Sequence, residues 1–263
     1  MNIKKVLSIA GSDCSGGAGI QADMKTMTVS GCYAMSVITA LTAQNTTGVY
    51  GVSDVDPEFV GKQIDCVFED IRPDAVKIGM VSNREIISII AERLLFYKAE
   101  KIVVDPVMVA TSGGSLLADG TVNTLIEKLF PIASVITPNL PEASVLCGLK
   151  IESISDMEKA ARFLTGMTNG AVIIKGGHLT DSADDLLAYE NGLIWYKAPR
   201  IDTKNSHGTG CTLSSAIACE LAKGKDIPEA FRIAKDFISN ALSTQMDLGA
   251  GNGPLNHLFK MNK

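Results

Sequence analysis

Short apolar runs alternate with amphipathic segments along most of this chain, and this alternation restricts its fold more than any other feature. The runs are rich in Val and Ile and stand at residues 5–10, 36–41, 75–78, 101–104, 134–136 and 171–174. Because they are apolar throughout rather than at every second position, each is expected to be a strand buried on both faces. The β-α order then predicts a three-layer αβα fold, in which helices cover both faces of a mostly parallel central sheet.

The pattern changes in the last third of the chain. Residues 186–189 and 193–196 flank an Asn-Gly pair, which is typical of a β-hairpin and predicts a small antiparallel edge on the sheet. Two helices are expected afterwards, over residues 209–223 and 227–246. No repeat or linker divides the sequence, so we expect a single domain over residues 1–263.

Helix starts are expected where a capping side chain precedes an apolar-periodic run. Ser82 with Glu85, and Ser155 with Glu158, have the spacing of a capping box.

Charge and composition exclude several classes of partner. The formal net charge is −5 and the chain has no basic stripe, so neither nucleic acid nor an anionic membrane is expected as a partner. No apolar stretch approaches the ~18 residues of a membrane span, and the N-terminus does not resemble a signal peptide. We therefore expect a cytoplasmic protein whose 6 cysteines, which include no C-x-x-C pair, are free thiols.

The strongest candidate for chemistry is the Gly-Thr-Gly-Cys run at residues 208–211, which leads into a predicted helix. Its glycines allow several backbone N–H groups to face one point, and the helix adds its unpaired first-turn N–H groups. Such a junction suits a phosphate or a phosphoryl group in transfer, although an ordinary turn that only starts a helix can have the same sequence. Cys211 at this position is predicted to be biased toward the thiolate.

Polar side chains follow several of the predicted strands, at the sheet edge where ligands bind in open parallel sheets. Asp105 ends one strand and Lys175 another, while Asn139 and Glu142 follow a third. Asn139 and Glu142 suit Mg²⁺ beside nucleotide phosphates, but they also suit a helix cap. Lys175 suits phosphate charge, but it could equally extend to solvent. Together these residues have the character of a phosphoryl-transfer site.

Other loops suggest contacts with a flat ring. A Gly-rich loop at residues 11–23 could hold phosphate or allow close backbone approach to an uncharged ligand. It lacks the Gly-Lys-Ser/Thr of a P-loop and the spacing of a dinucleotide-binding fingerprint. Gln44 can donate and accept at once, which suits an amino-heterocycle, although a solvated loop glutamine is an equal alternative. Met80 could contact a ring or belong to the core.

These segments resemble a known family. The Asn139–Glu142 spacing and the loop at residues 208–210 resemble the ribokinase superfamily of ATP-dependent small-molecule kinases. More closely, the chain is similar to the hydroxymethylpyrimidine/phosphomethylpyrimidine kinases of thiamine biosynthesis. The similarity covers most of the chain, in order, at residues 10–23, 37–41, 77–80, 105–108, 137–142, 175–178 and 207–214.

The resemblance implies a ribokinase-like fold and two successive phosphoryl transfers from ATP. The first acts on the hydroxymethyl group of 4-amino-5-hydroxymethyl-2-methylpyrimidine, and the second acts on the resulting monophosphate. The implied pyrimidine-binding residues are Gln44, Gly11, Ala18, Met80 and Val107. The implied ATP and Mg²⁺ residues are Asp105, Asn139, Glu142, Lys175 and Thr209, with Asp105 and Glu142 as metal ligands. The implied catalytic residues are Cys211, Gly208, Gly210 and Lys175.

The resemblance leaves the role of Cys211 open, because the sugar kinases of the superfamily carry an aspartate base at this position. A thiolate base and a thiol that completes the anion site are both possible. The alternatives to a pyrimidine kinase are a pyridoxal kinase and a non-catalytic pyrimidine-binding protein. Gln44 and the Ser-Gly-Gly run at residues 15–17 favour the pyrimidine. The intact Asp105, Glu142, Lys175 and Cys211 favour catalysis. Residues 110–115 are our candidate for a lid, and relatives suggest a homodimer.

Overall fold

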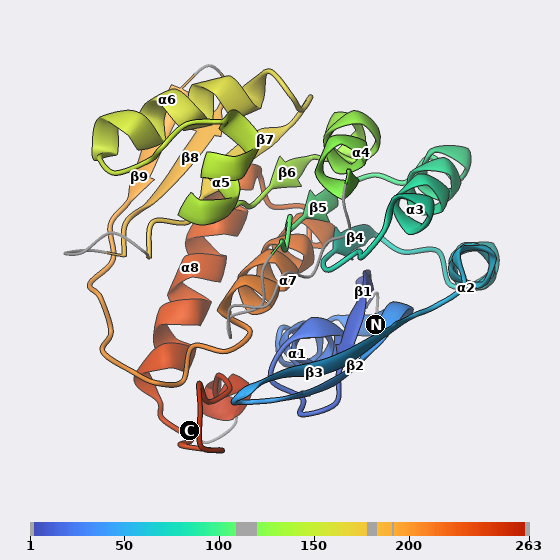
Figure 1. Cartoon of the computed structure of the whole chain (residues 1–263), viewed down its shortest axis with the longest axis horizontal. Helices are drawn as coiled ribbons and strands as arrows, with labels where there is room; N and C mark the ends of the chain where they lie inside the picture. Colours follow the sequence, from blue (N-terminus) through green and yellow to red (C-terminus); the bar gives the residue numbers. More distant parts are fainter. Residues whose placement is uncertain (1–2, 109–119, 178–182, 191, 261–263) are drawn as a thin grey trace.

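A computed structural model describes residues 3–108, 120–177, 183–190 and 192–260. Within them, nine strands form one sheet in the order β3-β2-β1-β4-β5-β6-β7-β8-β9 (Figure 1). The strands are β1 (Lys5–Asp13), β2 (Tyr33–Asn45), β3 (Gly48–Asp54), β4 (Ala75–Ile78), β5 (Ile102–Val104), β6 (Val135–Ile136), β7 (Ala171–Ile174), β8 (Asp185–Tyr189) and β9 (Gly192–Tyr196). Neighbours from β2 to β7 run parallel, and β8 and β9 form the expected antiparallel hairpin. The predicted fold class is confirmed.

Helices cover both faces of this sheet, which explains why its central strands are mostly apolar. In β1, Leu7 and Ile9 pack in one core and Val6 packs in the other. The first core lies against α2 (Pro57–Asp70), α3 (Arg84–Phe96), α4 (Thr121–Lys128), α5 (Leu140–Cys147) and α6 (Ile154–Thr165). The second lies against α1 (Gly19–Val29), α7 (Thr209–Ala222) and α8 (Ile227–Ser243). Short 3-10 helices lie at Phe130–Ile132, after α4, and at His257–Lys260, after α8.

The second edge of the sheet was not predicted. β3 pairs antiparallel with β2, and most of its residues are exposed, so it has no apolar face that a sequence pattern could reveal. Its pairing extends β2 as far as Asn45. Gln44 therefore lies within a strand and not in the loop where the sequence pattern placed it.

Both predicted capping boxes were wrong by one or two residues. α3 begins after Asn83, whose side chain accepts a hydrogen bond from the Ile86 N–H, while Ser82 is buried before it. α6 begins after Ser153, so that Ser155 lies inside the helix. A neighbouring Asn or Ser caps a helix equally well, and spacing alone does not distinguish these candidates.

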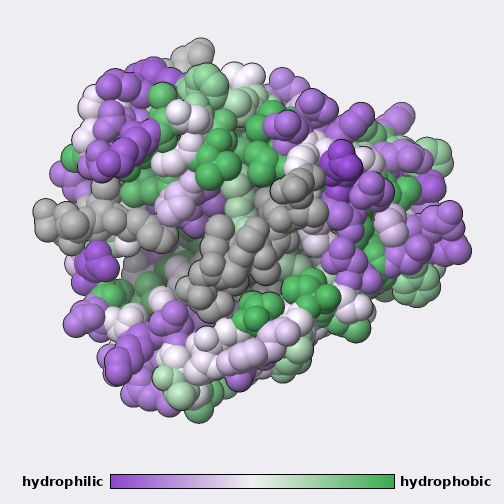
Figure 2. Space-filling view, viewed as in Figure 1, coloured by the Kyte–Doolittle hydropathy of each residue, from purple (hydrophilic) through white to green (hydrophobic). Residues whose placement is uncertain are grey.

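Figure 2 shows hydrophilic residues around much of the outline of one face, with hydrophobic residues gathered nearer its centre. In the described ranges, no helix is both long and apolar enough to span a bilayer.

Candidate active site

A lysine and two carboxylates meet where β5, β6 and β7 end. Lys175 Nζ lies 2.7 Å from Asp105 Oδ1 and 3.9 Å from Glu142 Oε2. Thr137 Oγ1 donates to the same Asp105 oxygen over 2.9 Å. A parallel bridge between Asn139 and Lys175 brings the start of α5 beside the end of β7. The residues expected to serve ATP and Mg²⁺ therefore come together from separate strands.

Glu142 does two things in this cluster. Its side chain accepts from the Asn139 N–H over 2.8 Å, and the Asn139 side chain accepts from the Glu142 N–H over 2.9 Å, so the expected capping box is present. Burial and the nearby Asp105 charge, opposed by Lys175, raise the pKa of Glu142 to about 7. The pKa of Lys175 is also raised, but for a different reason. Burial opposes the lysine charge and would lower this pKa, but the charges of Asp105 and Glu142 outweigh burial.

The chemistry of this donor set fits Mg²⁺ held partly by its substrate. Among the described residues, no three His, Cys, Asp or Glu side chains are grouped to hold a metal. Asp105 and Glu142 form a pair, and Mg²⁺ commonly takes one or two carboxylates and completes its shell with phosphates and water.

The loop at residues 208–211 starts α7 beside this cluster. Gly208 precedes the helix with a φ of +81°, and a Cβ there would lie 1.9 Å from the Gly17 carbonyl oxygen. A Cβ on Gly210 would lie 3.2 Å from Asp105 Oδ2 and 3.3 Å from Lys175 Nζ. The first turn of α7 is therefore in close contact with the Asp105–Lys175 pair, and a side chain at position 210 would force this pair to shift by a few tenths of an ångström.

Cys211 is half-buried, and the prediction of a thiolate-biased side chain was wrong. Burial raises the pKa of the Cys211 thiol to about 11, although the Lys77 charge and a hydrogen bond from the Gly19 N–H act in the opposite direction. Desolvation outweighs these two opposing effects, so the thiol is protonated at neutral pH. Thr209 is also occupied, since its hydroxyl donates to the Ser206 carbonyl over 2.6 Å.

An ion pair that was not predicted lies behind this loop. Lys77 Nζ lies 2.8 Å from Asp23 Oδ2, and both side chains are fully buried. Ser8 and Ser215 each donate a hydroxyl hydrogen bond to Asp23. The signal in the sequence was a lysine inside the apolar run 75–78, but nothing in the spacing identified its partner 54 positions earlier.

The expected pyrimidine-binding residues come from four strands and the segments after them: Gly11 lies on β1 and Ala18 after it, Gln44 lies on β2, Met80 follows β4 and Val107 follows β5. Gly11 is in contact with Met80, because a Cβ on Gly11 would lie 2.5 Å from the Met80 methyl carbon. Ala18 donates its N–H to Asp13 Oδ2 over 2.8 Å. Val107 donates its N–H to the Asp105 carbonyl over 2.8 Å.

Asp13 and His207 are functional candidates to which the sequence pattern assigned no role. His207 Nε2 lies 2.9 Å from Asp13 Oδ2 and 3.3 Å from the Gln44 side-chain nitrogen. The Asp13 carboxylate also accepts the N–H groups of Gly17 and Ala18. Since these N–H groups are occupied, close approach to an uncharged ligand suits the Gly-rich loop better than phosphate binding does.

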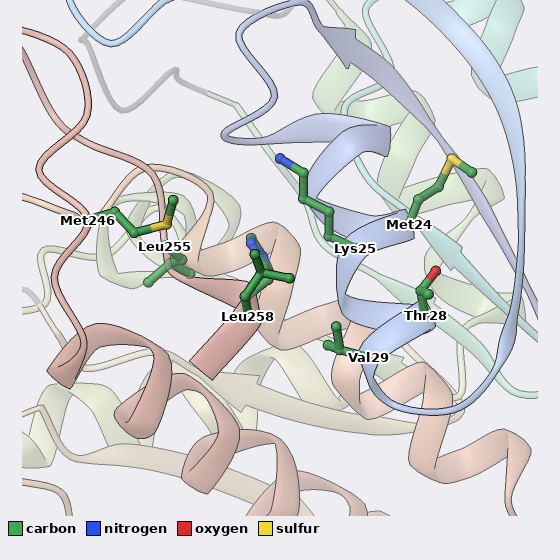
Figure 3. Close-up of a pocket in the computed structure, with 8 residues that line it drawn as sticks. Met24, Lys25, Thr28, Val29, Met246, Leu255 and Leu258 are labelled. Carbon is green, nitrogen blue, oxygen red and sulfur yellow. The ribbon is translucent and has the colours of Figure 1, made fainter. Parts of the chain in front are cut away.

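A cavity of about 380 Å³ lies elsewhere, between α1 and the C-terminal segment (Figure 3). It is lined mainly by apolar side chains, among them Met24, Val29, Met246 and Leu255, and none of the predicted site residues lines it. The candidate lid at residues 110–115 lies outside the described residues.

A three-layer αβα fold in which a glycine-rich helix start lies beside a lysine–carboxylate cluster is that of a small-molecule kinase of ribokinase-like fold. The sequence model of the phosphomethylpyrimidine kinase family matches residues 13–256, and the chain belongs to this family. It is 47% identical to the hydroxymethylpyrimidine/phosphomethylpyrimidine kinase of Bacillus subtilis over 265 residues, which covers 100% of this chain and 98% of that protein.

Solved structures agree with this assignment. The crystal structure of phosphomethylpyrimidine kinase from Clostridium difficile is 47% identical, with a TM-score of 0.82, and the match covers 91% of this chain and 99% of that one. The ADP complex of Bacillus subtilis pyridoxal kinase is 35% identical, with a TM-score of 0.92 and full coverage of both chains at 100%.

Proposed function

We propose that this chain transfers a phosphoryl group from ATP to the hydroxymethyl oxygen of 4-amino-5-hydroxymethyl-2-methylpyrimidine, and then a second one to the monophosphate. The product would be the pyrimidine diphosphate used in thiamine biosynthesis. The observation that carries the proposal is the contact of Gly210 with the Asp105–Lys175 pair. It puts the anion loop, a cation and a carboxylate around one point, as phosphoryl transfer requires.

Each residue of the site has a role in this proposal. Lys175 offsets phosphate charge, and the first-turn N–H groups of Gly210 and Cys211 would donate to the transferring group, whereas the Thr209 N–H already donates to the Ser206 carbonyl. Cys211 acts as a neutral thiol that donates a hydrogen bond, because its raised pKa disfavours a base at neutral pH. A loose phosphoryl-transfer transition state makes little demand on a strong base.

Nucleotide and metal belong to the same proposal. The ADP complex of the related pyridoxal kinase supports a nucleotide at this site. Asp105 and Glu142, with Asn139 and Thr209 nearby, would hold Mg²⁺ and nucleotide phosphate, and the metal would neutralise charge on the phosphates. A single domain, a homodimer and a cytoplasmic location, as expected from the sequence, complete it.

The ring-binding side consists of Gln44, Gly11, Ala18, Met80 and Val107. Gln44 is near Asp13 and His207, and Gly11 contacts Met80. A carboxamide that can accept from an amino group and donate to a ring nitrogen suits the aminopyrimidine.

A second candidate is pyridoxal phosphorylation, which the structural similarity to pyridoxal kinase favours. Side-by-side turnover of the aminopyrimidine and of pyridoxal, with ADP release measured, separates the two. We expect the pyrimidine to have the higher kcat/KM. A clear preference for pyridoxal would contradict the substrate assignment, and no turnover of either would favour a binding protein.

A further inference from the structure

Asp13 is a buried carboxylate, and each of its oxygens accepts two hydrogen bonds from the loop that follows it. Asp13, only 2% exposed, accepts at Oδ1 from the Ser15 N–H and hydroxyl, and at Oδ2 from the N–H groups of Gly17 and Ala18. Burial alone would favour the neutral acid, but these bonds and His207 outweigh it and hold the pKa of Asp13 well below its usual range. An ionised carboxylate can only accept, so His207 Nε2, which lies 2.9 Å from Oδ2, must carry a hydrogen.

The hydrogen on His207 Nε2 restricts how the side-chain amide of Gln44 can be oriented. The terminal carboxamide lies 3.3 Å from His207 Nε2 on one side and 3.3 Å from Thr42 Oγ1 on the other. Thr42 Oγ1 donates its single hydrogen to the Ser12 carbonyl over 2.8 Å, so it can only accept from Gln44. A side-chain nitrogen of Gln44 facing His207 would set two N–H donors against each other. A half-turn of the amide keeps its shape and removes this clash, because Nε2 then donates to Thr42 and Oε1 shares the His207 Nε2 hydrogen that Asp13 also accepts.

The neighbours of Gln44 are held firmly in place. A Cβ on Gly17 would lie 2.3 Å from His207 Cδ2, so the first loop packs directly on the imidazole ring. The backbone N–H of His207 donates to the Gly253 carbonyl, and the backbone N–H of Asn252 donates to the carbonyl of Thr46, directly after β2. One short C-terminal stretch thus ties the histidine to the strand that carries Gln44.

We propose that Asp13 and His207 are positioning residues that fix the direction of the Gln44 amide, and thereby select a ring with an amino group beside an unprotonated ring nitrogen. The proposal rests on the proposed function, in which Gln44 binds the pyrimidine. After its two protein contacts, the carboxamide keeps one acceptor on the His207 side and one donor on the Thr42 side. The ring amino group then lies on the His207 side and the ring nitrogen on the Thr42 side, the pairing by which Gln reads the amino edge of adenine.

An analogue with the opposite hydrogen-bonding order tests this selection. In the 4-oxo analogue of the substrate, a carbonyl replaces the amino group and the adjacent ring nitrogen carries hydrogen. The wild-type amide cannot turn to meet this order, so we expect kcat/KM to favour the amino compound strongly. In His207→Leu the amide is free to turn, and we expect the amino-to-oxo ratio of kcat/KM to fall about 100-fold.

Matched variants separate positioning from simple structural damage. His207→Gln restores a donor near the Nε2 position and is expected to keep the ratio within about 5-fold of wild type. Thr42→Val removes the other neighbour and is expected to lower the ratio, whereas Thr165→Val, on α6, is the control and leaves it unchanged. A structural role alone would reduce turnover of both substrates together, and an unchanged ratio in His207→Leu and Thr42→Val would overturn the proposal.

A measurement on the wild-type protein covers the case in which His207→Leu or Thr42→Val does not fold. In a long-range ¹H–¹⁵N correlation spectrum of the labelled protein, His207 is assigned by the loss of its signals in His207→Gln. We expect hydrogen on Nε2, and a neutral ring with hydrogen only on Nδ1 would overturn the inference. If the wild-type protein phosphorylates neither pyrimidine, the proposed function fails, while this spectrum still decides how the amide is held.

Discussion

Lys77 and Asp23 form a salt bridge of 2.8 Å with both side chains at 0% exposure, directly behind the anion loop. Burial opposes the charge on Lys77, but Asp23 and the other charges that face it together outweigh burial and raise the pKa of the ammonium group. The charge on Lys77 in turn favours the Cys211 thiolate. Ser8 and Ser215, from β1 and α7, complete the shell of Asp23. The pair therefore joins β1, α1, β4 and α7 in one buried polar cluster.

Removing one partner of this pair should destabilise the protein severely. Lys77→Met leaves the Asp23 carboxylate buried without its counter-ion, and about 3–5 kcal/mol of unfolding free energy should be lost. The double variant Lys77→Met/Asp23→Leu should lose clearly less than the sum of its single variants, because no isolated charge remains. Urea unfolding measures all three, and strictly additive losses would contradict a coupled pair.

Cys211→Ala should lower kcat by about 100-fold or more, because one positioned polar group typically contributes a rate factor of about this size. Cys211→Ser keeps a hydrogen-bond donor and should stay within about 10-fold of wild type. The pH dependence of kcat distinguishes a neutral donor from a thiolate base. If Cys211 is a neutral donor, kcat should not rise between pH 7 and 9 through ionisation of the thiol. A rate that climbs about tenfold per pH unit, with Cys211→Ser inactive, would instead identify a base.

Glu142 should make stability depend on pH. Its pKa is raised from 4.5 to about 7 in the folded protein, so protonation favours the fold. This contribution is complete below pH 4.5 and is lost as the pH rises through 7. The unfolding free energy should therefore fall between pH 5 and 8 by up to about 3 kcal/mol, given 1.4 kcal/mol per pKa unit. Glu142→Gln, which stays neutral, should show a smaller fall in the same urea series, and an identical fall would refute this account.

Gly210→Ala should separate activity from stability. The added methyl lies within 3.3 Å of both Asp105 and Lys175, so kcat should fall about 10-fold or more as the pair shifts. Alanine is also the better helix former, by roughly 0.5–1 kcal/mol, so the unfolding free energy should change little. Gly51→Ala in β3 is the matched control, since its Cβ would meet only Ala43 at 3.7 Å. Normal turnover in Gly210→Ala would mean that the loop does not need this close approach.

The sheet was predictable because strands buried on both faces require apolar residues at every position. Val6, Leu7 and Ile9 illustrate this, since they divide between the two cores. β3 was not predictable for the opposite reason: its residues are mostly exposed and it is held by backbone pairing with β2. A strand without a buried face leaves no periodic signal.

The site was predictable where chemistry follows from position at the end of a strand. Asp105 and Lys175 could be placed at one edge because parallel strands end together. The protonation of Cys211 could not be predicted, since it depends on how much water the fold removes around the thiol. The Asp13–His207 contact joins residues 194 positions apart, and no local pattern indicates such a pairing.

The most direct test of the proposed two-step kinase is a time course with the purified chain, the aminopyrimidine alcohol and Mg²⁺-ATP, followed by mass spectrometry of the products. We expect the monophosphate to accumulate first and then decline as the diphosphate grows, with one ADP released at each step. A single phosphorylation that stops at the monophosphate would contradict the second step. No phosphorylated pyrimidine at all, while pyridoxal is converted, would contradict the proposed function.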